Sequence, residues 1–122
     1  MTRVIGPDFV ALQVRDLEVS KRFYTELLGL VPAPDSPPNA VVFQTTPIQF
    51  AVRLPIVNLD ESPKPGWGMA LWLKCEHADS LCALLGEHGI KIAQGPSDGP
   101  FGRMFSFIDP DGYNITVHGS GG

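Results

Sequence analysis

A histidine and two glutamines in predicted strands are the first candidates for holding a divalent metal ion. His118 lies two residues beyond Thr116 in a predicted strand, so both side chains would share one strand face. Gln13 and Gln49 are possible oxygen donors. A site made of His118, Gln13 and water would contain no carboxylate and too few strong ligands for a transition metal. A partly exposed histidine is therefore the simpler interpretation of His118, and we expect no metal or other cofactor.

No other catalytic arrangement stands out. No serine lies in a nucleophile-elbow motif, and no glycine-rich phosphate loop follows a strand. Asp109 and Asp111 fall in an Asp-Pro-Asp-Gly sequence that is typical of a tight turn. Cys75 and Cys82 do not form a CxxC pair, and we interpret them as two reduced, small hydrophobic side chains. The sequence therefore indicates no catalytic residue.

Aromatic, small and polar residues at strand positions could instead line a pocket for a small molecule. Planar ligands stack on Trp or Phe, and a few polar groups orient them. The same residues could simply fill a core or line a dimer interface, and Arg103 could either hold an anionic group or be solvated. The candidate ligand-binding residues are Phe9, Gln13, Trp67, Gly68, Trp72, Arg103, Asn114, Thr116 and His118.

Phe9 and Gln13, the first two of these candidates, lie in a predicted strand that is followed by a helix. Residues 9–14 alternate with the two-residue period of a strand, and Leu17 to Leu28 repeat at helical spacing. Asp16 can cap this helix and Gly29 can end it. A brief strand over 30–33, a proline-rich loop, and a hairpin of strands 41–44 and 48–54 complete a β-α-β-β-β order.

The second half repeats this order. A strand over 68–74, a helix that ends at Gly89, and three short strands over 91–93, 103–108 and 114–118 match the first half. We predict one domain over residues 1–122, with module one at about 8–55, a linker over 56–66 and module two over 67–119. Each module has a sheet that one helix cannot cover, so the two modules are expected to pack together. The predicted fold class is α+β.

Two motifs connect the chain with a known family. The run V-x-D-L-x-x-S-x-x-F-Y-x-x-x-L-G-L within residues 14–30, and the turn over 109–114, resemble the vicinal oxygen chelate superfamily. That superfamily includes glyoxalase I, extradiol dioxygenases and the bleomycin resistance proteins. The resemblance implies paired modules whose curved, mostly antiparallel sheets form a cup, with helices outside and the functional site inside.

The resemblance also implies where a metal would bind. In most metal-dependent members, His, Gln or Glu side chains open the first strand and its counterpart in the second module, and a third lies in the last strand. In this chain those positions are Phe9, Gly68 and Thr116. Phenylalanine and glycine have no donor atom, and a threonine hydroxyl is a poor ligand. The usual metal site is therefore expected to be absent.

Composition narrows the possible partners. The 122 residues include 9 Lys and Arg against 13 Asp and Glu, for a net charge of −4, and no basic cluster occurs. Nucleic acid and anionic membrane are therefore unsuitable partners. No leader follows Met1 and no apolar run could cross a bilayer, so we expect a soluble, cytoplasmic protein.

Three functions remain open at this point. The first is a metal-free binding protein, similar to the bleomycin resistance type, that sequesters a small aromatic or amphipathic molecule and thereby confers antibiotic resistance. The second is a glyoxalase-like lyase or isomerase, or an extradiol-dioxygenase-like enzyme, with displaced metal ligands. The third is an interaction module that has lost its pocket. Members of this family commonly form homodimers, and the resemblance implies the same here.

Overall fold

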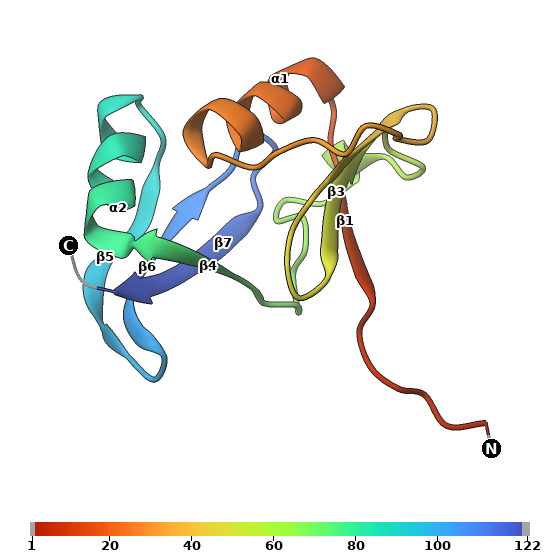
Figure 1. Cartoon of the computed structure of the whole chain (residues 1–122). Coiled ribbons are helices and arrows are strands. Elements are labelled where there is room, and N and C mark those ends of the chain that lie inside the picture. The colour runs from red at the N-terminus through yellow and green to blue at the C-terminus, as the bar shows by residue number, and fades with distance from the viewer. Residues whose placement is uncertain (1, 121–122) are drawn as a thin grey trace. The chain divides into compact units, whose positions relative to one another are not determined.

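The computed structural model describes residues 2–120 and divides the chain into two compact units, the first ending at Glu61 and the second beginning at Ser62. This boundary falls within the segment 56–66 that the sequence predicts to be a linker. Each unit contains one sheet with a helix against it (Figure 1). The α+β class is confirmed, with two mixed sheets of three and four strands.

The first unit has a mixed sheet with strand order β1-β3-β2. β1 is parallel to β3, and β2 is antiparallel to it, so the predicted hairpin of the second and third strands is confirmed. The elements of this unit are β1 (Phe9–Gln13), α1 (Leu17–Arg22), η1 (Phe23–Leu27), β2 (Ala40–Phe43), β3 (Gln49–Arg53) and η2 (Leu59–Glu61).

The helix of the first unit begins and ends as its sequence predicts, but it is not regular. Asp16 Oδ1 accepts a hydrogen bond of 3.1 Å from the Val19 N–H, and Gly29 has a φ of +76°. Between these ends the α-helix widens into the π-helical turn η1. The fully buried Tyr24 ring packs there against Phe43 and Phe50 of the sheet, with ring centroids 6.0 and 5.2 Å apart.

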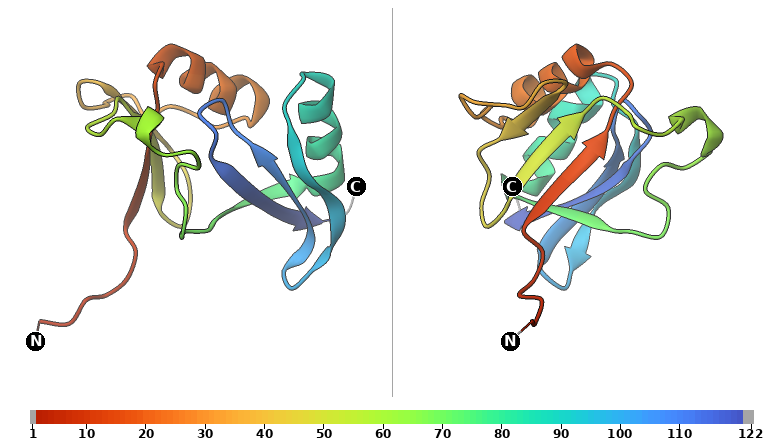
Figure 2. Two further views of the ribbon diagram at one scale, coloured as in Figure 1. Left: turned by 180° about the vertical axis from the view of Figure 1, so that it is seen from behind. Right: turned by 90° about the vertical axis from the view of Figure 1, so that its right-hand side faces the viewer.

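The second unit has a mixed sheet with strand order β4-β7-β6-β5. β4 is parallel to β7, and the other two strand pairs are antiparallel. Figure 2 shows these strands and the helix α2 from two further sides. The elements are β4 (Leu71–His77), α2 (Ala78–Glu87), β5 (Ile92–Gly99), β6 (Gly102–Ile108) and β7 (Asn114–Ser120).

One face of the second sheet and one face of α2 form the core of this unit. Phe105, Phe107, Ile115 and Val117 share one face of β6 and β7 by strand alternation, and all four are fully buried or nearly so. Leu85 on α2 is also fully buried. The period-two pattern therefore leaves the opposite face of this sheet uncovered by α2.

Three predicted strands differ from the structure. The strand predicted over 30–33 is reduced to a single bridge between Pro32 and Phe43, because proline lacks the N–H that a ladder needs. β4 begins at Leu71, not at residue 68, because Gly68 has a φ of +91°, which is incompatible with a strand. β5 runs to Gly99, well beyond the predicted end at residue 93, with register shifts that accommodate Pro96.

The turn between β6 and β7 confirms the structural interpretation of its aspartates. Asp109 is 4% exposed, and its Oδ1 accepts hydrogen bonds from the backbone N–H groups of Asp111 and Tyr113, at 2.9 and 3.0 Å. These bonds hold the chain that enters β7. Among residues 2–120, no helix is long and apolar enough to cross a membrane.

Candidate functional site

Three aromatic rings gather on the face of the second sheet that α2 does not cover. The Trp72 ring centroid lies 5.6 Å from that of Phe101 and 6.0 Å from that of His118, and the Phe101 and His118 centroids are 5.7 Å apart. Trp72 is 37% exposed and Phe101 is 66% exposed. We call Trp72, Phe101 and His118 the aromatic cluster. It offers an apolar surface on which a planar molecule can stack.

Strand alternation places two of these residues. Leu71 and Leu73 of β4 point to the side of α2, so Trp72 points to the opposite side. Trp72 is the register partner of Thr116 in β7, and His118 follows two residues later on the same face. The predicted sharing of one face by Thr116 and His118 therefore agrees with the register, and Trp72 lies beside them.

Phe101 reaches the cluster from the turn of the β5–β6 hairpin. Gly99 and Gly102 are register partners, so Pro100 and Phe101 form a two-residue turn between them. Gly102 has a φ of +110°, and a Cβ at this position would lie 2.9 Å from the Gly119 carbonyl oxygen. A glycine is therefore needed for the hairpin to lie this close to β7.

Phe101 was not among the candidate ligand-binding residues. The predicted strands ended at residue 93 and began again at residue 103, whereas the structure continues β5 to Gly99. The available signal was the pair of glycines at 99 and 102 around a two-residue turn, which is typical of a hairpin.

Of the other candidates in this unit, Asn114 begins β7, two residues before Thr116, and is exposed. Trp67 is 74% exposed and lies outside the aromatic cluster, with the Lys64 ammonium 4.8 Å from its ring centroid. Gly68 is exposed in the chain before β4, so its predicted place in a strand over 68–74 is wrong.

Phe9 and Gln13 belong to the first unit. Phe9 begins β1 and is 49% exposed. Gln13 ends β1, and its Oε1 accepts hydrogen bonds from the backbone N–H groups of Ile56 (2.7 Å) and Val57 (3.2 Å). The side-chain amide oxygen of Gln13 thus stabilises the chain that follows β3.

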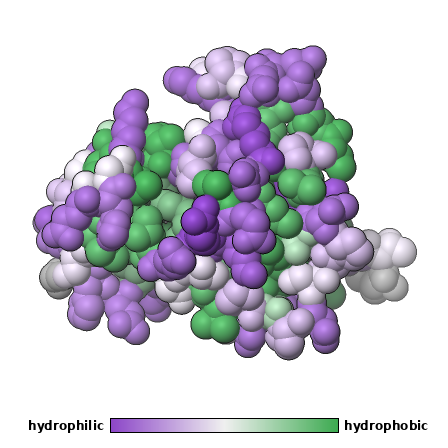
Figure 3. Space-filling model, turned by 90° about the horizontal axis from the view of Figure 1, so that it is seen from above, coloured by the Kyte–Doolittle hydropathy of each residue, from purple (hydrophilic) through white to green (hydrophobic). Residues whose placement is uncertain are grey.

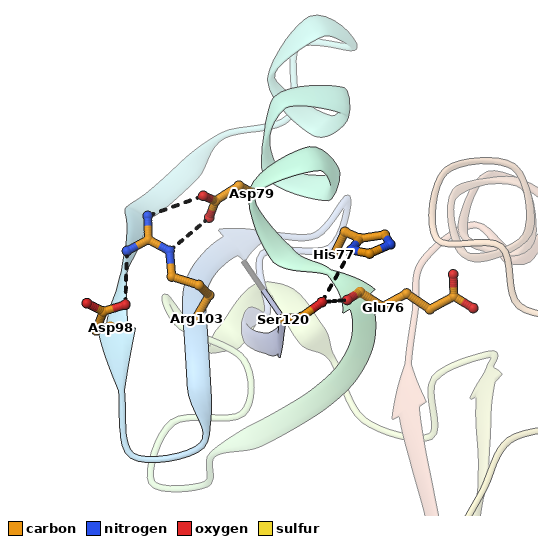
Figure 4. Close-up of polar contacts among 6 residues, drawn as sticks. All are labelled: Glu76, His77, Asp79, Asp98, Arg103 and Ser120. Carbon is orange, nitrogen blue, oxygen red and sulfur yellow. Dashed lines mark hydrogen bonds and ion pairs between the residues drawn. The ribbon is translucent and has the colours of Figure 1, made fainter. Parts of the chain in front are cut away.

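Arg103 lies on the helix-facing side of its strand, not with the aromatic cluster. Its register neighbours along β6 on that side are the buried Phe105 and Phe107. The guanidinium bonds both oxygens of Asp79 at 3.2 and 3.3 Å and Asp98 at 3.3 Å (Figure 4). These hydrogen bonds, the one to Asp79 first, raise the pKa of Arg103. Arg103, which could have held an anionic group or been solvated, is instead paired with two carboxylates.

A second polar group joins the ends of β4 and β7. Ser120 Oγ donates a hydrogen bond to the Glu76 carbonyl oxygen and lies 3.2 Å from His77 Nδ1 (Figure 4). His77 and Ser120 are both exposed. These contacts tie the end of one strand to the other, and the Glu76 carboxylate points away from Arg103 and Asp79.

The donor set does not fit the metal site that the family resemblance implies. Phe9 and Gly68 supply no donor atom, and Thr116 supplies a hydroxyl in β7. Within residues 2–120, no three His, Cys, Asp or Glu side chains lie close enough together to hold a metal ion. The residues at these positions therefore do not fit a bound metal ion.

The environments of the two cysteines do not favour a reactive thiolate. Cys82 is buried in α2 and Cys75 is partly buried in β4, and both are free thiols. Burial is the main cause that raises the pKa of each thiol, so both remain protonated at neutral pH. The interpretation of both cysteines as reduced hydrophobic residues agrees with this environment.

The surface seen from above mixes hydrophilic residues with hydrophobic patches (Figure 3). Several large apolar side chains are well exposed in the described chain. They include Val4, Ile5, Ile56, Trp67, Met69 and Phe101.

Comparisons with known proteins agree with the resemblance. The family model of the Glyoxalase/Bleomycin resistance protein/Dioxygenase superfamily matches residues 6–117. A glyoxalase-related enzyme from Fulvimarina pelagi has a similar structure, with a TM-score of 0.73, 26% identity, and coverage of 93% of this chain and 87% of that one. No match was found among curated proteins.

Two further solved structures show the range of functions among similar proteins. TnmS3, an antibiotic binding protein from Streptomyces sp. CB03234, is 27% identical over all of both chains, with a TM-score of 0.70. A glyoxalase/dioxygenase from Nostoc punctiforme is 25% identical over 96% of each chain, with a TM-score of 0.72. On the match over residues 6–117, this chain belongs to the Glyoxalase/Bleomycin resistance protein/Dioxygenase superfamily.

Proposed function

We propose that this protein binds a planar small molecule on the open face of its second sheet and does not change it chemically. The observation that carries the proposal is the aromatic cluster, whose exposed Trp72 and Phe101 rings lie on a sheet face that α2 does not cover. A stacked planar ligand would cover these rings, and burial of aromatic surface is a large source of binding energy. Asn114 and Thr116 offer polar groups on the same face.

One similar protein and the residues at the metal-ligand positions support binding rather than a reaction. A similar protein, TnmS3, binds an antibiotic, whereas the metal-ligand positions of this chain lack suitable donors. We therefore propose metal-free sequestration of an aromatic or amphipathic compound, such as an antibiotic, in the cytoplasm. Resistance would follow from the lowered concentration of free compound.

We also propose that the protein forms a homodimer. Val4, Ile5, Ile56 and Met69 are large apolar side chains that are all more than 70% exposed, and covering them would remove apolar surface from water. A second copy of the chain would cover them. Light scattering coupled to size-exclusion chromatography should give twice the chain mass of 13.2 kDa, and a single-chain mass would contradict this part of the proposal.

The binding proposal is tested by thermal unfolding in a screen of planar aromatic compounds, with chelator-treated protein. At least one compound should raise the Tm, because a ligand that binds only the folded state stabilises it. Trp72→Ala should weaken that compound's affinity by about tenfold or more, as loss of one stacking ring costs about 1–3 kcal/mol. Trp67→Ala should have a smaller effect, because Trp67 lies outside the aromatic cluster.

Two results would contradict the proposal. One is a screen in which no planar compound raises the Tm. The other is binding or turnover that appears only after zinc, nickel, manganese or iron(II) is added, which would favour an enzyme with displaced metal ligands.

A further inference from the structure

We propose that the molecule bound at the aromatic cluster is a planar aromatic carboxylic acid, and that Lys74 and His118 hold its carboxylate. This inference rests on the proposed binding function and adds the chemical class of the ligand. Lys74 lies in β4, two residues after Trp72, and is the register partner of His118 in β7. The cation and the imidazole are therefore neighbours at one border of the aromatic cluster.

Both side chains are available to a ligand. Lys74 is exposed and His118 is partly exposed. Within residues 2–120, the Lys74 ammonium makes no ion pair or hydrogen bond, and His118 makes ring contacts only. Arg103, in contrast, is paired with Asp79 and Asp98 on the other side of the sheet.

The charges around the cluster favour an anion. β6 and β7 contain no Asp or Glu, and the residues beside His118 on this face are Met104 and Thr116. The one carboxylate of β4 is Glu76, which lies beyond an irregularity in the register that follows Lys74. A positive charge next to apolar rings attracts an anion more strongly than one in bulk water, because the rings exclude solvent.

The spacing sets the size of the ligand. Two residues of a strand span about 6.6 Å, so the Lys74 ammonium can reach an anion located one ring width from a group stacked on Trp72. A carboxylate attached directly to a two-ring aromatic system meets this condition. The imidazole N–H of His118 can donate a second hydrogen bond to the same carboxylate.

Isothermal titration calorimetry with 2-naphthoate and 2-naphthamide separates charge from stacking, since the two probes have almost the same shape. The intact protein should bind 2-naphthoate about fivefold more tightly, a typical contribution of one partly exposed ion pair. Added salt should reduce this preference. Lys74→Gln should remove it, Lys74→Arg should keep most of it, and Glu76→Gln should increase it.

Lys91→Gln is the matched control, because it removes the same charge next to β5. β5 is three strands away from β4, about 14 Å across the sheet, so the preference for 2-naphthoate should persist. Thermal unfolding of each variant checks that it is folded, and Lys74 is exposed enough that little change in Tm is expected.

The outcomes distinguish this inference from the proposed function. Equal binding of the two probes by the intact protein would overturn the carboxylate and leave the binding function standing. A preference for 2-naphthoate that survives Lys74→Gln would also overturn it, because the anion would then bind elsewhere. Binding of neither probe at millimolar concentration would count against both.

Discussion

The two units begin alike and then diverge. In each, a strand leads into a helix that ends at a glycine with a φ of +76°, Gly29 in the first unit and Gly89 in the second. After the helix, residues 30–39 of the first unit contain four prolines and form one isolated bridge. The corresponding part of the second unit forms β5, which pairs with β6 in a hairpin.

This difference determines where a binding surface can form. The β5–β6 hairpin brings Phe101 to Trp72 and His118, and the first unit has no hairpin in the corresponding place. The polar residue of β1 that could have served a ligand, Gln13, instead accepts backbone hydrogen bonds from Ile56 and Val57. The two units therefore share the strand and helix that begin them. Gln13 stabilises the backbone in the first unit, whereas the second unit exposes the aromatic cluster.

The largest expected effect concerns the turns that lead into β3 and β7. Asp109→Ala should lower the free energy of unfolding by about 3 kcal/mol, because two buried backbone N–H groups lose a charged acceptor. Asp109→Asn keeps the acceptor oxygen and should cost less. In the first unit, Thr45 Oγ1 donates one bond of 2.6 Å to the Ile48 carbonyl oxygen, so Thr45→Val should cost about 1 kcal/mol.

Urea unfolding of the three variants measures these differences. An Asp109→Ala variant as stable as the intact protein would show that the turn does not depend on this carboxylate.

The next effect compares the two exposed phenylalanines. Phe101→Ala should weaken binding of a planar ligand about fivefold, because one of the stacking rings is lost. Phe9→Ala removes a similarly exposed ring from the first unit and should change the affinity less than twofold, by about 0.4 kcal/mol at most. Calorimetry on both variants measures the two affinities. An equal loss of affinity in both would contradict a binding surface confined to the second unit.

The third prediction concerns the buried faces of the two helices. Ser20 of α1 is fully buried and its Oγ has no hydrogen-bond partner among residues 2–120, whereas α2 buries Ala78, Cys82 and Leu85. Ser20→Ala should therefore raise the free energy of unfolding by about 1 kcal/mol, since it removes an unsatisfied hydroxyl and favours the helix. Cys82→Ser should lower it by about 1 kcal/mol. Destabilisation by Ser20→Ala would mean that the hydroxyl has a role in packing.

The smallest expected effect concerns the ion pairs of the two units. The Arg103 and Asp79 side chains are 30% and 39% exposed, whereas the Arg15 and Asp60 side chains are 41% and 80% exposed. Arg103→Gln should lower the Tm slightly, less than Asp109→Ala or Thr45→Val, and the loss should shrink in 1 M salt. Arg15→Gln should have a still smaller effect. A larger loss for Arg15→Gln would reverse the expected order.

The regular parts of the fold were predictable from sequence because they depend on local patterns. The cap at Asp16, the glycines that end both helices, the β2–β3 hairpin and the Asp109 turn were all predicted correctly. The π-helical turn η1 was not, because it depends on how Tyr24 packs on Phe43 and Phe50. Tertiary packing of this kind leaves no mark on the helical periodicity.

The candidate site was only partly predictable. The two-residue spacing correctly placed Thr116 and His118 on one face of β7, and the register of the sheet adds Trp72 beside them. Phe101 was missed because its position depends on a long hairpin containing Pro96, a residue that usually argues against a strand. Arg103 was misjudged because its ion pairs connect residues that are distant in sequence, Asp79 among them.

Mapping of a bound ligand by NMR would test the central claim most directly. In ¹⁵N-labelled protein titrated with 2-naphthoate, the largest amide shifts should lie at residues 71–75, 101–104 and 116–119, with the Trp72 indole N–H among them. Shifts concentrated on α2 or in the first unit would contradict the claim that the open face of the second sheet is the binding surface.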